Sequence, residues 1–250
     1  MSSTLLADAR STVPAIEARG ISVGYDGRPV VRDLSLTVGV GEIVALMGPN
    51  GAGKSTTLLG IVGALPLMAG SILWGGREER QSLTVLARRG LAYISEDRSI
   101  FFQRTARENL RIGRADESQA LRLFPELRER LNVKAGLLSG GEQQMLTIAR
   151  ALARRPRVLV VDELSLGLAP LIVERLLQAV KTAAANGTGV LMVEQFVHKA
   201  LTVADRGLVM IDGQLVLEGR GSDLVHRMDE IESTYLATDR AELGADTGRT

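Results

Sequence analysis

The chain has 250 residues, of which 45% are hydrophobic and 24% charged, as is ordinary for a globular protein able to bury a large core. Its formal net charge of +1 creates no overall field that would attract nucleic acid, so we expect no nucleic-acid partner. It contains no cysteine, which excludes disulfides, thiolate metal sites and cysteine catalysis.

Neither end of the chain predicts a membrane segment. Residues 1–14 lack the apolar core of a secretory signal, and no apolar run approaches the roughly 20 residues that cross a bilayer. We therefore expect a cytoplasmic protein, which would serve a membrane process only by docking onto the membrane segments of other proteins. Residues 1–14 and 237–250 are predicted to be flexible tails.

The first half of the chain begins with strand signals. The runs Ile16–Val23 and Pro29–Val38 are separated by Asp26-Gly27, which is a hairpin turn signal. The dense apolar run Glu42–Met47 ends at a glycine cluster, which is typical of a buried strand in a parallel sheet. Helical periodicity follows over Lys54–Val62.

The second half alternates helices and strands. Arg98–Val133 is rich in Arg and Glu with apolar residues at helical spacing, so it predicts a helical insertion. A long helix should follow Gly140-Gly141 and run to Arg154, before Pro156. Further strand signals are Arg157–Val161, Gly189–Val193 and Gly207–Ile211, the last of which enters a hairpin at Asp212-Gly213. Alternating strands and helices imply an α/β fold with a mainly parallel sheet.

A glycine-rich segment predicts a phosphate-binding loop. Gly48–Ser55 fits the pattern G-x-x-x-x-G-K-[ST] between a predicted strand and a predicted helix. Its glycines let backbone N–H groups curl around a polyphosphate, Lys54 supplies a cation, and the Ser55 hydroxyl can ligate Mg²⁺. The predicted nucleotide contacts are Gly48, Pro49, Asn50, Gly51, Ala52, Gly53, Lys54, Ser55 and Thr56.

Two adjacent carboxylates follow the apolar strand Arg157–Val161. Burying such a strand and ending it with Asp162-Glu163 is costly without a cation or a proton to handle. Asp162 is predicted to hold Mg²⁺ through its water shell, and Glu163 to accept a proton from the attacking water. The alternative is an ordinary strand end that reaches solvent.

A second anion cradle is predicted where Leu138–Gln144 precedes a long helix. Ser139, Gly140 and Gly141 at a helix N-terminus resemble another phosphate site. Because one nucleotide does not need two cradles from one chain, we expect two chains arranged head to tail. Alternatively, Ser139 is only a helix cap, with Glu142 as its capping-box partner.

The order of these three motifs resembles the ABC ATPase family over about Ile16 to Leu236. The resemblance implies one P-loop ATPase domain over 15–236, with an antiparallel β part near its N-terminus and a helical subdomain at about 97–155. It also implies that Ser139, Gly140, Gly141 and Glu142 close over ATP held by a partner subunit, and that Tyr25 stacks on adenine. A plain strand tyrosine is the alternative for Tyr25.

Finer matches resemble the LivF-type ATPase of branched-chain amino acid importers. They include Tyr93–Glu96, Ser165–Pro170 and Val193–Gln195. Where most ABC ATPases have Gln, Asp and His, this chain has Glu96, Ala169 and Gln195, and the LivF-like branch commonly shares these exchanges. The resemblance assigns Glu96 to Mg²⁺ or the lytic water and Gln195 to the γ-phosphate. Because these exchanges alter charge, we hypothesise weaker catalysis by the isolated subunit than by its complex.

The resemblance implies the cofactors ATP and Mg²⁺ and a peripheral position on the cytoplasmic face of the membrane. The implied partners are permease subunits, a second ATPase subunit (related or identical) and, indirectly, an extracytoplasmic solute-binding protein. The segment from Glu96 to about Leu131 is predicted to contact the permease; alternatively, it is only a solvated helical face. Urea or amide import, a non-transport ABC ATPase and a regulatory module that senses ATP remain alternative functions.

Overall fold

The computed structural model describes residues 13–78, 82–97, 99–165, 167–194, 197–228 and 230–231. Within these residues the strands form two sheets, one of four strands in the order β2-β1-β4-β5 and one of six in the order β10-β9-β3-β8-β7-β6. The sequence predictions for the two tails and for Gln195 concern residues outside the described part of the chain, apart from Val13 and Pro14.

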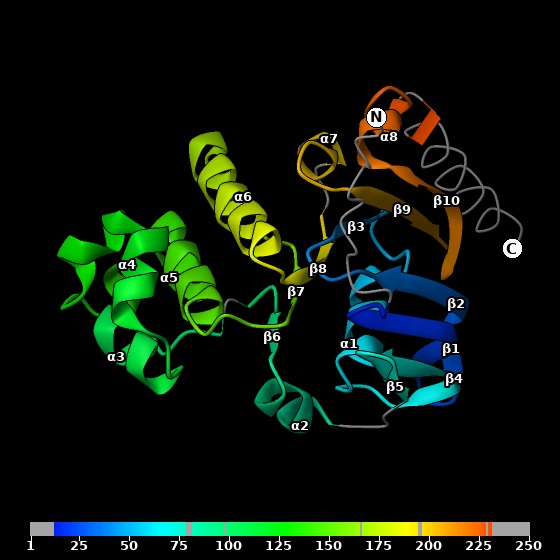
Figure 1. The fold of residues 1–250 in the computed structure, drawn as a ribbon, viewed down its shortest axis with the longest axis horizontal. Coiled ribbons are helices and arrows are strands. Elements are labelled where there is room, and N and C mark those ends of the chain that lie inside the picture. Colours follow the sequence, from blue (N-terminus) through cyan, green and yellow to red (C-terminus); the bar gives the residue numbers. More distant parts are fainter. Residues whose placement is uncertain are drawn as a thin grey trace, which may run out of the picture.

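The six-stranded sheet is the centre of the fold (Figure 1). Strands β6, β7, β8, β3 and β9 run parallel and β10 pairs antiparallel with β9, as the alternation of strands and helices predicted. Every residue of β3, β7 and β8 is buried, because helices and the second sheet cover both faces. The strands are β3 (Ile43–Met47), β6 (Leu91–Ile94), β7 (Val158–Asp162), β8 (Gly189–Val193), β9 (Arg206–Ile211) and β10 (Gln214–Arg220).

The four-stranded sheet is antiparallel and contains the predicted hairpin. Asp26 and Gly27 both have positive φ, 50° and 75°, which is the backbone that a two-residue hairpin turn requires. The sheet packs its apolar face against the central sheet and α1, with Ile16, Val44 and Leu58 in one core. Its strands are β1 (Ile16–Tyr25), β2 (Arg28–Val38), β4 (Leu67–Trp74) and β5 (Arg77–Glu78).

The helices include the predicted insertion, which forms a lobe on one side of the sheet (Figure 1). Phe124, Leu127 and Leu110 are fully or almost fully buried there, which confirms the apolar face expected in this stretch. The long helix α5 ends at Leu152, two residues earlier than predicted. The helices are α1 (Lys54–Ile61), α2 (Leu83–Arg88), α3 (Ala106–Ile112), α4 (Glu117–Leu123), α5 (Gly140–Leu152), α6 (Pro170–Ala185), α7 (Val197–Leu201) and α8 (Gly221–Val225), with 3₁₀ turns at Pro125–Arg130 and Ala135–Leu137.

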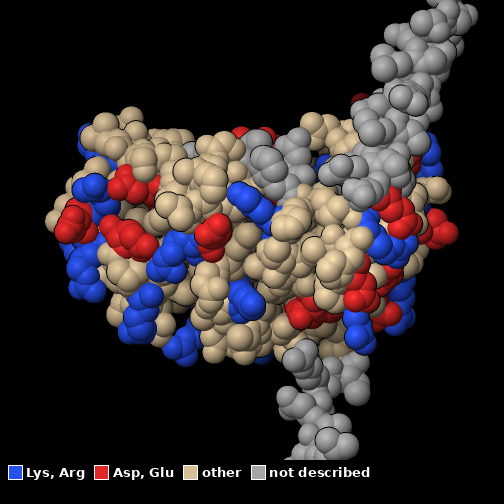
Figure 2. Space-filling model, turned by 90° about the horizontal axis from the view of Figure 1, so that it is seen from above, with Lys and Arg blue, Asp and Glu red and all other residues tan. Residues whose placement is uncertain are grey.

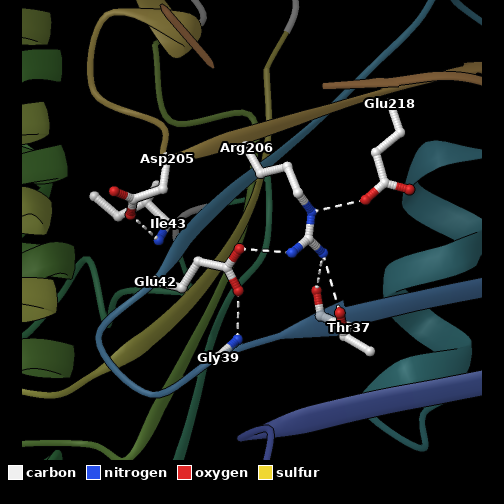
Figure 3. Close-up of polar contacts among 7 residues, drawn as sticks. All are labelled: Thr37, Gly39, Glu42, Ile43, Asp205, Arg206 and Glu218. Atoms are coloured by element: carbon white, nitrogen blue, oxygen red, sulfur yellow. Dashed lines mark hydrogen bonds and ion pairs between the residues drawn. The ribbon is translucent and has the colours of Figure 1, made fainter. Parts of the chain in front are cut away.

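A polar network joins the two sheets where β2 turns into β3 (Figure 3). The Arg206 guanidinium contacts Glu42 at 2.7 Å and Glu218 at 2.9 Å, and it donates to the carbonyl oxygen and the hydroxyl of Thr37. Next to it, Asp205 accepts the Ile43 backbone N–H at 2.8 Å. These bonds fix the start of β3, which carries the glycine-rich loop at its other end.

Two features of the structure concern the expectations about nucleic acid and membrane segments: the surface charge and the length of the helices. On the face shown in Figure 2, basic and acidic side chains are interspersed. Among the residues that the structure describes, no helix is both long and apolar enough to cross a membrane.

Candidate functional site: a phosphate loop beside two carboxylates

The glycine-rich loop connects the buried strand β3 to α1. A side chain at Gly48 would place its Cβ 2.2 Å from the Met210 carbonyl oxygen, so this position requires glycine. Gly53 caps α1 in the left-handed region, with φ 97°, and no side chain caps the helix. The first N–H groups of α1 therefore keep no side-chain partner, as an anion site at a helix N-terminus requires.

Lys54 points back into its own loop. Its Nζ donates to the carbonyl oxygens of Gly48 and Pro49 at 2.9 and 2.8 Å, and the residue is 5% exposed. Burial lowers the pKa of Lys54, while Glu163 and Asp162 act in the opposite direction. The other predicted loop contacts divide by exposure: Asn50, Gly51 and Ser55 are exposed, Pro49 is half-buried, and Ala52 and Thr56 are buried.

Ser55 and Asp162 come together from two different elements. The Ser55 hydroxyl at the start of α1 lies 3.1 Å from Asp162 Oδ1 at the end of β7. Burial is the main cause that raises the pKa of Asp162, and Glu163 and Glu96 add to it. A hydroxyl and a carboxylate are the hard oxygen donors that Mg²⁺ prefers. Among the described residues, no three His, Cys, Asp or Glu side chains gather closely enough to hold a metal by themselves. An ion bound at Ser55 and Asp162 would therefore complete its coordination shell with phosphate and water.

Glu163 and Glu96 line one pocket of about 290 Å³. Glu163 has a positive φ of 51°, and its N–H donates to the Val193 carbonyl oxygen at 3.1 Å. The pocket has ample room for water beside the Glu163 carboxylate. Gln144 also lines it, is 3% exposed, and has an Oε1 without a hydrogen-bond partner. The sequence did not single out Gln144, whose only signal was its place next to the Ser139 motif.

Ser139 begins α5 with a capping box. Its hydroxyl accepts the Glu142 N–H at 3.3 Å, and the Glu142 carboxylate accepts the Ser139 N–H at 2.8 Å. Arg130 donates to the same carboxylate at 2.6 Å and, as the largest cause, lowers the pKa of Glu142. The cap that sequence reasoning left as an alternative is therefore present, and Glu142 shapes the turn. Ser139 and Gly140 are exposed at its surface.

The two predicted anion cradles lie apart in the molecule. Figure 1 shows α5 in the helical lobe, on the opposite side of β6 from α1 and its loop. The Ser139 turn begins α5 and Lys54 begins α1, so the two turns belong to helices on opposite sides of β6. The chain does bring together Lys54, Ser55, Asp162 and Glu163.

Tyr25 ends β1 and is 48% exposed. Val23, two residues earlier, pairs with Val31, and a Cβ at Gly53 would lie 3.3 Å from Val31 Cγ2. This end of the antiparallel sheet thus lies near the glycine-rich loop with an aromatic ring open to solvent.

A groove of about 700 Å³ separates the central sheet from the helical lobe. Phe101 and Ile112 line it and are each 49% exposed. Arg150 lines it as well, donates to the Ser99 carbonyl oxygen at 2.6 Å, and has a pKa lowered by burial. Exposed apolar side chains around a half-buried cation suit a protein partner better than water.

A glycine-rich loop between a central strand and a helix of a parallel sheet defines the P-loop class of nucleotide hydrolases. Residues 31–165 match the family described as ABC transporter. The chain is 39% identical over 227 residues to the high-affinity branched-chain amino acid transport ATP-binding protein BraG of Pseudomonas aeruginosa, covering 86% of this chain and 97% of that protein. It is 34% identical over 236 residues to the lipopolysaccharide export system ATP-binding protein LptB of Escherichia coli, covering 90% and 98%. A solved ATP-binding cassette of an ABC transporter, in its ADP conformation, aligns at a TM-score of 0.78 with 25% identity, over 95% of this chain and 100% of that one.

The chain therefore belongs to the ABC transporter family, as its three motifs predicted, and is an ATP-binding subunit whose ATPase activity is coupled to transport. Subunits of this family dimerise and work with membrane permease components. The predicted fold class, a mainly parallel sheet with an antiparallel β part and a helical insertion, is also confirmed.

Proposed function

We propose that this subunit energises the import of a small solute, with branched-chain amino acids as the first candidate. Two observations support this substrate: the 39% identity to BraG, and the exchanges Glu96, Ala169 and Gln195 that resemble the LivF-like branch. The observation that supports the mechanism is that α1, which Lys54 begins, and α5, which follows the Ser139 turn, lie on opposite sides of β6 within one chain.

In the proposed nucleotide site, the loop from Gly48 to Thr56 cradles the phosphates. Lys54 gives up its bonds to two loop carbonyls and turns its ammonium to the outer phosphates, which satisfy it better because they are charged. Tyr25 stacks on the adenine ring. Ser55, Asp162 and Glu96 would hold Mg²⁺, which would neutralise charge on the phosphates when bound.

Hydrolysis in this proposal depends on positioning and charge stabilisation. Glu163 polarises a water in the pocket that it shares with Glu96, and accepts its proton. Gln195 donates a hydrogen bond to the γ-phosphate. Glu96 adds negative charge beside this phosphate, which supports the hypothesis that the isolated subunit turns over slowly.

The proposed active unit is a head-to-tail pair. The exposed residues Ser139 and Gly140 of one subunit, with Gly141, cap the γ-phosphate held by Lys54 of the other. Because each site then takes parts from both chains, ATP holds the pair closed and hydrolysis releases it. The second subunit is a related ATPase or a copy of this chain.

The proposed contact to the permease is the groove that includes Phe101, Ile112 and Arg150. Phe101 and Ile112 belong to the segment from Glu96 to about Leu131, so closure of the pair would move a permease helix seated there. In this proposal the subunit lies on the cytoplasmic face of the membrane, and a solute-binding protein acts from the other side.

The nucleotide roles are tested by two substitutions in the purified chain. Lys54→Ala should abolish ATP binding or turnover. Glu163→Gln should still bind ATP and accumulate a closed dimer on gel filtration, because binding survives while proton transfer does not. Normal turnover by Glu163→Gln would remove Glu163 from its role.

The substrate is tested by uptake in cells that lack this chain. Deletion should reduce uptake of labelled leucine, isoleucine and valine; the wild-type chain should restore it and Lys54→Ala should not. Loss of urea or amide uptake instead would point to another importer, and loss of lipopolysaccharide export would favour the function of the LptB relative. Unchanged transport of every solute would favour a non-transport role or an ATP sensor.

A further inference from the structure

A buried acid outside the predicted site follows β8 directly. Glu194 is 3% exposed, and both of its carboxylate oxygens have partners. Oε1 accepts the Leu164 backbone N–H at 3.0 Å, and Oε2 accepts the Ser165 hydroxyl at 2.5 Å. Both partners belong to the loop that follows Glu163, and they are themselves 1% and 3% exposed. Burying a carboxyl group this deeply costs free energy unless hydrogen bonds satisfy its oxygens, as these two bonds do.

These two bonds and a backbone bond one residue earlier in each segment together form a clamp between the end of β8 and the loop after β7. The Glu163 N–H donates to the Val193 carbonyl oxygen at 3.1 Å, so two consecutive residues at the end of β8 hold three consecutive residues after β7. Glu163 needs such support, because its φ of 51° lies in the left-handed region that glutamate rarely adopts. A freed loop would let this backbone relax and carry the Glu163 carboxylate away from its pocket.

We propose that Glu194 is a positioning residue for ATP hydrolysis: by clamping Leu164 and Ser165 it fixes the Glu163 carboxylate. The inference rests on the proposed role of Glu163. Glu194 acts through the loop and touches no reacting atom, so its loss impairs the chemical step and leaves ATP binding in place.

The charge of Glu194 suits this role. Burial raises its pKa to about 7, with a further contribution from nearby Glu163. A large fraction of the group is thus neutral at neutral pH, and adds little negative charge beside the proposed base. In that form it can donate to the Ser165 hydroxyl while it still accepts from Leu164. Glutamine has the same capacity, which makes Glu194→Gln the conservative variant.

The test measures kcat, KM and ATP affinity for Glu194→Ala and Glu194→Gln in the full-length chain. We expect Glu194→Ala to lower kcat by about 10- to 100-fold, because small displacements of a reacting group have effects of this size. KM and ATP affinity should change by less than about twofold, since the phosphate loop is untouched. Glu194→Gln should stay within about threefold of the wild type, because its amide keeps both bonds.

The matched control is Thr188→Val at the other end of β8. Thr188 is 5% exposed and donates one buried hydrogen bond, to the Pro156 carbonyl oxygen at 2.8 Å. It should lose stability with little change in kcat. A kcat for Glu194→Ala no lower than that of Thr188→Val, or a Glu194→Gln variant as impaired as Glu194→Ala, would overturn the proposal.

Two further variants keep the outcome decisive. If Glu194→Ala does not fold, Glu194→Asp replaces it, since its shorter carboxylate cannot reach both partners; wild-type kcat in that variant would also refute the clamp. Glu163→Gln is assayed alongside. If it turns over normally, the proposed role of Glu163 has failed; if it is inactive while Glu194→Ala is unaffected, only the positioning role of Glu194 has failed.

Discussion

The two interpretations of Ser139, a helix cap or an anion cradle, can be separated because the chain contains a matched cap. Thr105 begins α3 with the same capping box: its hydroxyl accepts the Glu108 N–H at 3.1 Å, and its own N–H donates to Glu108 at 2.7 Å. Ser139→Ala and Thr105→Ala therefore remove the same kind of bond, at 3.3 and 3.1 Å, from two different helices.

The expected effects differ in kind. Either substitution should destabilise the fold by about 1 kcal/mol, the usual effect of losing a cap, and lower Tm by about 2–4 °C for a chain of this size. Ser139→Ala should in addition lose a hydrogen bond to a charged phosphate in the closed pair, worth about 1.5–3 kcal/mol. That corresponds to a fall in turnover of about 10- to 150-fold. Thr105→Ala should leave the turnover of the isolated subunit unchanged.

The assay is phosphate release at saturating ATP and Mg²⁺, with Tm measured on the same preparations. It is run at several protein concentrations, because a paired active unit makes specific activity rise with concentration. Equal turnover in the two variants would refute the anion cradle and leave Ser139 as a cap only.

Three further predictions follow from the structure. The pKa of Glu194 is raised from 4.5 to about 7 in the fold, so its contribution to stability is complete below about pH 4.5 and is lost as pH rises through 7. Chemical unfolding across this range should therefore show a flatter pH dependence of the unfolding free energy in Glu194→Gln, with an upper limit of about 3 kcal/mol for the difference. A pH dependence equal to that of the wild type would contradict the burial argument. Arg206→Ala, which breaks the network of Figure 3, should lower the free energy of unfolding by about 2 kcal/mol and leave KM for ATP unchanged. A variant as stable as the wild type would show that the network does not contribute to stability. Gly48→Ala should destabilise the fold by more than about 2 kcal/mol, because the new Cβ would lie 2.2 Å from the Met210 carbonyl oxygen. The control Gly75→Ala, at φ 56° with open space around it, should cost about 1 kcal/mol. Equal losses of unfolding free energy in a denaturant titration would mean that the close approach does not matter.

The local sequence was enough for most strands of the central sheet. Glu42–Met47, Gly189–Val193 and Gly207–Ile211 matched β3, β8 and β9 within a residue, because a strand buried on both faces must be apolar throughout and end at turn residues. The hairpin at Asp26-Gly27 was equally readable, since few residue pairs tolerate two positive φ values.

Other elements were missed for identifiable reasons. Strand β4 contains Gly70 at φ 78°, where a Cβ would lie 2.3 Å from the Gly20 carbonyl oxygen, so a contact with a distant strand decides its shape. Helix α6 did carry a local signal, with Pro170 at its first position and Val173 and Leu176 on its buried face, but it was not recognised.

By itself, then, the sequence determined the phosphate loop, the carboxylate pair and the family, because each depends on residues adjacent in the chain. Only the tertiary structure decided which side chains from distant parts of the chain meet. Glu194 bonds to Leu164 over 30 residues and Arg206 to Glu42 over 164, and no local pattern encodes such pairs. The same holds for the places of α1 and α5 on opposite sides of β6, which follow from how the helical lobe packs on the sheet. Packing sets these relations, and short-range spacing does not.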